Sequence, residues 1–314
     1  MYSLSSIPFF DELSASQNIL IAGIGGGFDV YCGIPIFLNL KNQNKNVYLA
    51  NYSFTRLHET NAALVHPFCK KITPDTTEPT NGYFPEKYLS EWLEKNNFSS
   101  SVYAFSSPGV KQLQHAYQEL LSLFSIDTVI LVDGGTDGLM RGDEEDLGTF
   151  LQDYISLTAV MQIPLKKKVV ASIGFGLDEV SHYRFLENVA SVIWKDGFLG
   201  TTSLLSNSKE GKMYTNCVDY ANKRMPHTKS IVNNAIIQSS GGAFGKQYIE
   251  GTDAYIFVNP LMSMYYFFTL DTVMSESHYF SFIKDTITVD EALDKIRLIP
   301  LKMQMRKTEK LPFF

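Results

Sequence analysis

The stretch ILIAGIGGGFDVYCGIP, residues 19–35, indicates how this chain folds. A short apolar run over 19–22 leads into a series of glycines and an acid: Gly23, Gly25, Gly26, Gly27 and Asp29. A β-type run that ends in glycines and precedes a helix-compatible segment predicts the first strand–turn–helix unit of an α/β domain. A backbone without side chains also lets a ligand approach the strand end, where peptide N–H groups favour anions.

Neither standard phosphate-binding pattern is present in this turn. The spacing Gly23-x-Gly25-x-x-Phe28 places a bulky phenylalanine where the dinucleotide fingerprint has its third glycine. No Gly-Lys-Ser/Thr follows the turn, which excludes the Walker pattern. The stretch is therefore a glycine turn that carries an acid.

The same combination of an apolar run, glycines and an acid recurs twice further along the chain. The run DTVILVD (127–133) continues into Gly134, Gly135 and Asp137, and the run 169–173 continues into Gly174, Gly176 and Asp178. In a doubly wound sheet, ligands bind outside the carboxyl ends of the parallel strands. Three strand ends of this kind predict one site at a common edge of the sheet.

Composition restricts the class of protein. With 314 residues, 45% hydrophobic and 19% charged, the chain can bury a sizeable core. A net charge of −6 argues against a nucleic-acid partner, which would require a basic face.

Cys32, Cys69 and Cys217 are scattered and lack metal-ligand spacing, as expected in a reducing compartment. No apolar run is long enough for a membrane helix and the N-terminus does not resemble a signal peptide, so we expect a cytoplasmic protein without a membrane partner.

The order of elements predicts a single α/β domain over 1–314, with a mostly parallel sheet and helices on both of its faces. Within it, we expect a helix over 146–163, a late strand over 254–258, and a less regular excursion or lid around 197–229. The aromatic run 264–268 is predicted to be core or a dimer surface, and the aromatic content of the last third makes a homodimer an expectation.

Three of these segments together resemble a known family. VDGGTDGLMRGDEEDLGTFLQDYISL (132–157), with GIGGGFDVYCGIP (23–35) and GFGLDE (174–179), is similar to the family called domain of unknown function 1152. The likeness runs from about residue 19 to about 258. Phe28 stands where the family usually has a fourth glycine, and Asp137 shifts the register of the second acid. The resemblance implies a Rossmann-like α/β fold, a three-layer sandwich with a twisted sheet, and brings no settled activity with it.

The acids among the glycines suggest chemistry. Carboxylates at close quarters are costly unless a cation neutralises them, and hard oxygen ligands suit Mg²⁺ or Ca²⁺. The catalytic candidates are Asp29, Asp133 and Asp137. The ligand-binding candidates are Gly25, Gly26, Gly27, Asn51, Arg56, Gly134, Gly135, Asp143, Gly174, Gly176 and Asp178.

Two functions are compatible with this pattern. The first is an enzyme, a hydrolase or group-transfer enzyme that acts on a nucleotide, ribosyl or sugar-phosphate ligand. The second is a non-catalytic module that senses a nucleotide-like molecule or binds a partner, with the acids accepting hydrogen bonds from ligand hydroxyls.

Overall fold

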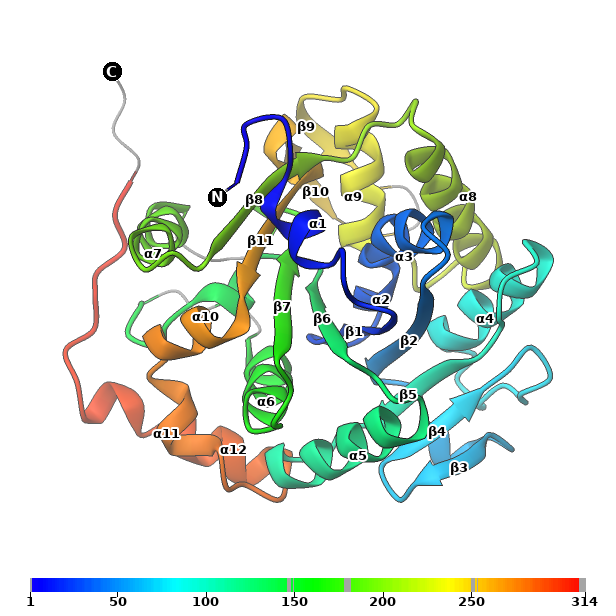
Figure 1. The fold of residues 1–314 in the computed structure, drawn as a ribbon, viewed down its shortest axis with the longest axis horizontal. Helices are drawn as coiled ribbons and strands as arrows, with labels where there is room; N and C mark the ends of the chain where they lie inside the picture. Colours follow the sequence, from blue (N-terminus) through cyan, green and yellow to red (C-terminus); the bar gives the residue numbers. More distant parts are fainter. Residues whose placement is uncertain are drawn as a thin grey trace.

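The computed structural model of this chain describes residues 2–145, 148, 150–177, 182–249, 252 and 254–310. Over these residues, a nine-stranded sheet has the order β3-β4-β5-β2-β1-β6-β7-β11-β8 (Figure 1). Its centre consists of five parallel strands: β1 (Asn18–Gly23), β2 (Asn46–Ser53), β5 (Val102–Ser106), β6 (Thr128–Asp133) and β7 (Lys167–Ser172). These runs are almost wholly buried, as expected for parallel strands that are covered on both faces.

Antiparallel strands extend the sheet at both sides. On one side β4 (Cys69–Ile72) pairs with β5, and β3 (Ala63–His66) pairs with β4. On the other side β11 (Met264–Thr269) pairs with β7, and β8 (Phe198–Ser203) pairs with β11. The aromatic run 264–268 is thus a buried strand of the central sheet, which confirms that it belongs to the core.

Two helical layers cover the sheet, each with its own hydrophobic core (Figure 1). One layer consists of α5 (Val110–Leu123), α6 (Leu151–Met161), α7 (His182–Trp194), α10 (Leu270–Glu276), α11 (Tyr279–Ile283) and α12 (Val289–Ile296). The other consists of α1 (Pro8–Glu12), α2 (Asp29–Cys32), α3 (Ile34–Asn42), α4 (Pro85–Lys95), α8 (Lys209–Arg224) and α9 (Ile231–Ser240). Short 3-10 turns are η1 (Leu57–Glu59), η2 (Asp137–Leu139), η3 (Pro260–Ser263) and η4 (Ile299–Leu301). The fold is the expected mixed α/β sandwich.

One local prediction requires correction, and two others are confirmed in part. The segment 197–229 is not a less regular excursion, because β8 and the capped helix α8 occupy most of it. The helix expected over 146–163 forms as α6 over 151–161, and positions 146, 147 and 149 of this prediction lie outside the described residues. The strand expected over 254–258 forms as β10 (Tyr255–Val258), but it pairs with β9 (Gly245–Tyr248) in a separate two-stranded sheet.

The order of the parallel strands reverses at one point of the sheet. From β1 the chain proceeds outward through β2 and β5 on one side, and then returns to β6 and β7 on the other. The order therefore reverses between β1 and β6, whose carboxyl ends lie next to each other. Such a switch point leaves a crevice at the carboxyl edge, where ligands bind in open α/β sheets.

Candidate functional site

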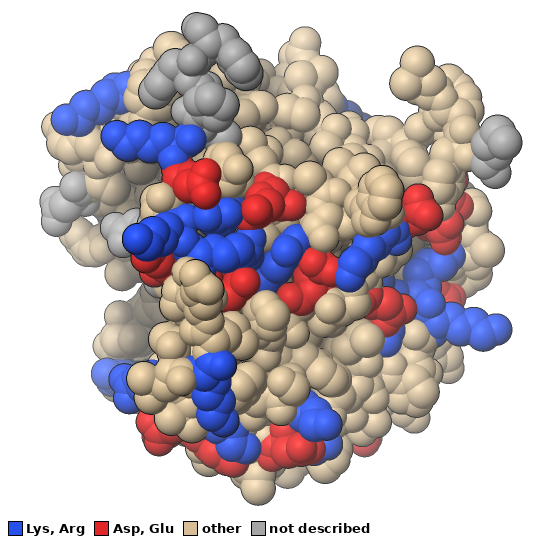
Figure 2. All heavy atoms as spheres, turned by 90° about the vertical axis from the view of Figure 1, so that its left-hand side faces the viewer, with Lys and Arg blue, Asp and Glu red and all other residues tan. Residues whose placement is uncertain are grey.

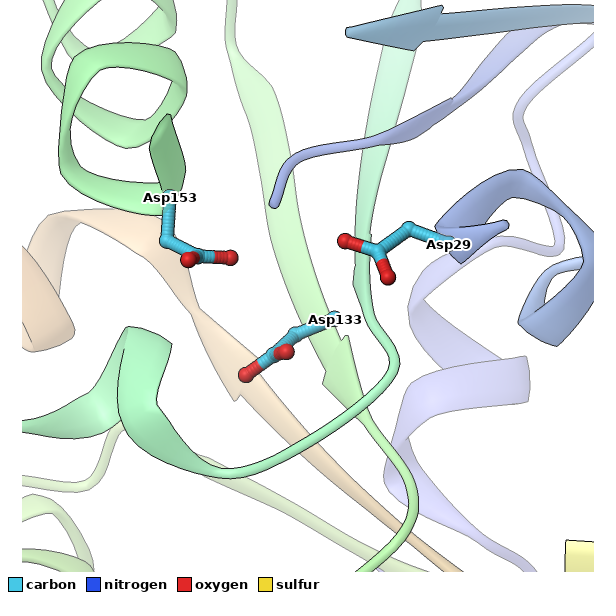
Figure 3. Close-up of side chains that lie close together, drawn as sticks. All are labelled: Asp29, Asp133 and Asp153. Atoms are coloured by element: carbon cyan, nitrogen blue, oxygen red, sulfur yellow. The ribbon is translucent and has the colours of Figure 1, made fainter. Parts of the chain in front are cut away.

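Three carboxylates from three separate elements meet at this switch point. Asp29 opens α2 after the glycine turn, Asp133 ends β6, and Asp153 lies in the first turn of α6. One oxygen from each lies within 4.8 Å of the other two. Figure 3 shows the three side chains directed toward a common space. Asp133 and Asp153 are nearly buried, and Asp29 is half-buried.

The glycine turn after β1 holds this cluster together. The backbone N–H of Gly25 donates a hydrogen bond to Oδ2 of Asp29 at 2.6 Å. The hydroxyl of Ser156, one turn after Asp153, donates to the carbonyl of Ile24 at 2.9 Å and ties α6 to the turn. A Cβ at Gly25 would lie 2.6 Å from Oδ1 of Asp153 and 2.7 Å from Oδ2 of Asp29. Glycine is needed here because the carboxylates occupy the space of a side chain.

The second glycine turn supports Asp133. Its Oδ2 accepts hydrogen bonds from the backbone N–H of Gly138 at 3.3 Å and from the Ser172 hydroxyl at 3.4 Å. A Cβ at Gly134 would lie 2.9 Å from Oδ1 of Asp29, so the first and second turns are in contact. Gly135 is buried in the same turn.

The third turn joins the second through its first glycine. Gly174 has φ +106°, and a Cβ there would lie 3.7 Å from the carbonyl group of Gly134. Gly176 instead lies beside the His182 ring. Asp178, predicted to bind ligand, lies outside the described residues.

The structure brings together only part of the predicted set. Asp137 is buried in η2 on the same turn as Asp133, but the third member of the carboxylate cluster is Asp153. Asn51 is fully buried, and its amide donates to the Gly27 carbonyl and to Glu86, so it supports the turn from inside. A direct ligand contact by Asn51 stays a prediction.

Two further predicted residues, Arg56 and Asp143, form ion pairs with other side chains. Arg56 is more than half exposed and pairs with Glu59 in η1. Asp143 accepts hydrogen bonds from Arg306, which also pairs with the buried Glu144. Neither residue belongs to the carboxylate cluster, and ligand contacts by both remain predictions.

Asp153 was missed because it does not follow a strand. A signal for it existed in the sequence: Asp153, Ser156, Leu157 and Val160 follow i, i+3, i+4, i+7 spacing, which places the acid on an otherwise buried helix face. A buried acid on such a face requires a polar or charged partner. The carboxylate cluster and the glycine turn provide that environment.

The donor set fits a hard divalent cation. Ca²⁺ binds carboxylate oxygens at about 2.3–2.6 Å and Mg²⁺ at about 2.0–2.1 Å. Two oxygens on opposite sides of Ca²⁺ are therefore about 4.6–5.2 Å apart, and adjacent oxygens are closer. The spread of the three aspartate oxygens, within 4.8 Å, accommodates Ca²⁺ directly and Mg²⁺ after a small contraction. Asp29, Asp133 and Asp153 are the residues that could hold such an ion.

The thiol nearest the cluster is unsuited to nucleophilic chemistry. Cys32 is fully buried, and a Cβ at Gly134 would lie 3.1 Å from its Sγ. Burial raises the pKa of Cys32 well above its ordinary value, and the carboxylates of Asp29 and Asp133 raise it further. The thiol therefore stays protonated, as expected for a packed cysteine.

An ion network holds the loop that leads from Asp133 toward Asp153. Arg306, near the end of the described chain, donates to Asp143 at 2.6 and 2.9 Å, to Glu144 at 2.7 Å, and also to Glu187. Glu144 in turn accepts the backbone N–H groups of Arg141 and Gly142. Figure 2 views the molecule from the left-hand side of Figure 1, and it shows acidic and basic side chains intermixed on that side.

A separate cavity of about 200 Å³ lies between α1, α3 and β8. Its lining includes Phe10, Pro35 and Tyr265, together with polar side chains such as Asn39. None of the three clustered aspartates lines it. We assign the candidate site to the switch point because the charged groups and the reversal of strand order coincide there.

Comparison with known proteins identifies the family. A family model described as "Protein of unknown function (DUF1152)" matches residues 20–306, so the chain belongs to this family. Neither the comparison with curated proteins nor that with solved structures gave a match. Among the described residues, no helix has the length and apolar character needed to cross a bilayer.

Proposed function

We propose that this member of the DUF1152 family is an enzyme, a hydrolase or group-transfer enzyme that acts on a nucleotide-like or sugar-phosphate ligand. The observation that carries the proposal is the meeting of Asp29, Asp133 and Asp153 within 4.8 Å at the switch point. Doubly wound sheets bind ligands at this place, and many unrelated activities use it. The fold alone therefore does not select the reaction, and the three carboxylates carry the proposal.

Electrostatics supports a cation between these side chains. Carboxylates that share a small, half-buried space repel one another unless a cation or a proton neutralises them. A cation held by these oxygens would polarise a phosphoryl oxygen and offset charge that develops in the transition state. Mg²⁺ in particular is usually bound by one or two carboxylates together with phosphates of the substrate.

The chain's own residues would orient such a ligand. The Gly25 N–H fixes the Asp29 carboxylate, and the Ser172 hydroxyl fixes that of Asp133. Asp137, buried on the second turn, is our candidate for proton transfer at the ligand. Gly25 and Gly134 provide side-chain-free backbone against the carboxylates, and the same turns continue through Gly26, Gly27 and Gly135.

The first test is cation binding. Mg²⁺, Ca²⁺ or Mn²⁺ at a hundredfold excess over its dissociation constant should raise the free energy of unfolding by about 2.7 kcal/mol. Asp153→Asn should remove most of this stabilisation, whereas Asp271→Asn, a change at an exposed acid of α10, should leave it unchanged. Equal stabilisation of wild type and Asp153→Asn would exclude a cation at the cluster.

The second test is turnover. A panel of nucleotides, NAD, ADP-ribose and sugar phosphates is incubated with the protein, with and without Mg²⁺, and products are identified by mass spectrometry. We expect a product to form, and we expect Asp29→Asn or Asp133→Asn to lower its rate of formation by about 10²–10⁴-fold. This result supports an enzyme. A ligand that binds and is recovered intact supports the non-catalytic module instead.

The environment of the cysteines supports a reducing compartment. Cys32, Cys69 and Cys217 are all free and buried. We propose a cytoplasmic location on this ground, since cytosolic thiols are kept reduced.

A further inference from the structure

An exposed aromatic ring stands against the glycine turn. Phe54 follows β2 at the carboxyl edge of the sheet, directly beside β1 and its turn. Its ring is so close to Gly26 that a Cβ there would lie 2.4 Å from Cζ, and a Cβ at Gly27 would lie 3.7 Å from Cδ2. Both glycines have positive φ, +99° and +60°, which few other residues adopt.

The exposure of this ring sets it apart from its neighbours in the chain. Phe54 is 48% exposed, whereas Ser53 and Thr55 are 1% and 7% exposed. One side of the ring lies on the glycines, and the Tyr52 ring meets it edge-on at 6.4 Å and 81°. An apolar ring held partly in water at a strand end has a surface available for a planar ligand group.

A buried carboxylate fixes the ring and the turn relative to each other. Glu86, at the start of α4, has no exposed surface and accepts hydrogen bonds from Asn51 at 2.8 Å and Thr55 at 2.9 Å. The Asn51 amide also donates to the Gly27 carbonyl at 2.9 Å. Thr55, which follows Phe54 in the chain, and the glycine turn are therefore both linked to Glu86, the turn through Asn51. This support lowers the entropy that a ligand would lose on ordering the site.

A polar group borders the same turn. A Cβ at Gly27 would lie 3.1 Å from the hydroxyl oxygen of Tyr83. Burial raises the pKa of Tyr83 above its ordinary value, and the charges of Glu86 and Asp29 raise it further. The hydroxyl therefore keeps its proton and remains a hydrogen-bond donor beside the turn.

The distances along the turn relate this ring to the carboxylate cluster. Gly25 contacts the carboxylates of Asp29 and Asp153, and Gly26 and Gly27 contact Phe54. Successive Cα atoms are about 3.8 Å apart, so the ring and the carboxylates contact adjoining residues of one turn. A ligand that places a phosphate at the carboxylates could lay a planar ring on Phe54.

We propose that the exposed face of Phe54, with the Tyr83 hydroxyl at its border, is a stacking subsite for the nucleobase of the ligand. This inference rests on the proposed function and narrows its ligand class from sugar phosphates in general to nucleosides and nucleotides. Aromatic side chains stack on any base because every base has a π-face. The subsite therefore selects for a base without selecting strongly among bases.

The test separates the base from the phosphate. Calorimetric titrations use two kinds of probe: nucleosides without phosphate (adenosine, guanosine, cytidine, uridine and nicotinamide riboside), and ribose 5-phosphate with Mg²⁺. The variants are Phe54→Ala, Phe54→Trp, and the matched control Phe244→Ala, at another exposed aromatic. Phe54→Ala should weaken the best nucleoside by about 5- to 150-fold and change ribose 5-phosphate by less than about twofold. Phe54→Trp, which keeps a stacking face, should restore nucleoside affinity, and Phe244→Ala should match wild type.

Each remaining outcome is decisive. Ribose 5-phosphate binding without binding of any nucleoside overturns the subsite and leaves the proposed function standing. Nucleoside binding that Phe54→Ala does not weaken also overturns it. Phe54-dependent nucleoside binding without ribose 5-phosphate binding supports the subsite and counts against the proposed function. Binding of neither probe overturns both.

Discussion

Nη2 of Arg306 lies 2.7 Å from Oε1 of Glu144, a carboxylate whose side chain has no exposed surface. The same guanidinium contacts Asp143, and Arg306 and Glu144 also form a parallel backbone bridge. Asn188 of α7 donates both to Glu144 and to the Leu139 carbonyl in η2. One basic residue from the C-terminal region thus holds the loop that carries Asp137 and precedes Asp153.

Removing this guanidinium should destabilise the fold strongly. Arg306→Met leaves Glu144 buried without its cation, and breaking a buried ion pair from one side costs about 3–5 kcal/mol. The measurement is the free energy of unfolding in urea. Arg297→Met is the control, because Arg297 pairs with Asp294 on the surface and such pairs contribute about 0–1 kcal/mol. Equal midpoints for the two variants would contradict this role for Arg306.

The network also predicts how stability depends on pH. Burial raises the pKa of Asp143, but hydrogen bonding and charge from Arg306 outweigh it and hold the pKa below its ordinary value. Glu187 has a lowered pKa for similar reasons, with Arg184 and Arg306 as its cationic neighbours. A carboxyl group with a depressed folded-state pKa stabilises the fold above its unfolded-state pKa, and this contribution is lost as the pH falls through the folded-state value.

Stability should therefore fall below about pH 4, and less steeply in Arg306→Met than in wild type. Urea unfolding at a series of pH values from neutral to about 2.5 provides the comparison. Parallel curves for the two proteins would show that Arg306 does not set these pKa values.

Gly25→Ala should disrupt the cluster while leaving the core intact. Its Cβ would lie 2.6 Å from an oxygen of Asp153 and 2.7 Å from one of Asp29, so at least one carboxylate must move. We expect cation-induced stabilisation to fall by at least about 1 kcal/mol, a loss of roughly fivefold in affinity. Gly241→Ala is the control, because a Cβ there meets its neighbours at 3.4 and 3.5 Å, which is ordinary contact. Cation binding by Gly25→Ala equal to that by wild type would place the ion elsewhere.

Asp143→Asn and Asp153→Asn should have opposite consequences. Asp143 pairs with Arg306, so its loss should lower stability and leave cation-induced stabilisation unchanged. Asp153 shares its space with two other carboxylates, so its loss relieves repulsion and should not lower the stability of the cation-free protein. It should nevertheless abolish cation-induced stabilisation. Thermal unfolding with and without Ca²⁺ measures both effects. If Asp143→Asn abolished cation-induced stabilisation and Asp153→Asn did not, the cation site would lie at Asp143 and not at the carboxylate cluster.

The sequence predicts strands and acidic strand ends well where the signal lies within a few neighbouring residues. The strands β1, β6 and β7 are short apolar runs with polar or glycine ends, and each was predicted close to its observed bounds. Asp29 and Asp133 were predicted for the same reason, since each lies at or just beyond the end of such a run. Their convergence follows from the parallel order of the strands.

Long-range packing was harder to foresee. The run that forms β11 contains four consecutive aromatics, without the polar alternation that marks a half-buried strand, and its pairing with β7 brings together segments about a hundred residues apart. Asp153 joins the cluster because Ser156 anchors α6 to the carbonyl of Ile24, a contact that spans 132 residues. The pairing of Asp143 with Arg306 spans 163 residues, so no local signal indicates it.

The separation of Glu144 and Arg306 has a consequence during synthesis of the chain. The two residues are 162 positions apart, and ribosomes add about 5–20 residues per second. Glu144 therefore emerges on the order of ten to thirty seconds before the residue that neutralises it. During that interval the charged carboxylate of Glu144 cannot be buried, because Arg306 is not yet there to pair with it. The segment around Glu144 must therefore remain hydrated. The β1–β6 sheet can assemble while translation continues, but the loop beside the carboxylates can close only after residue 306 has left the ribosome.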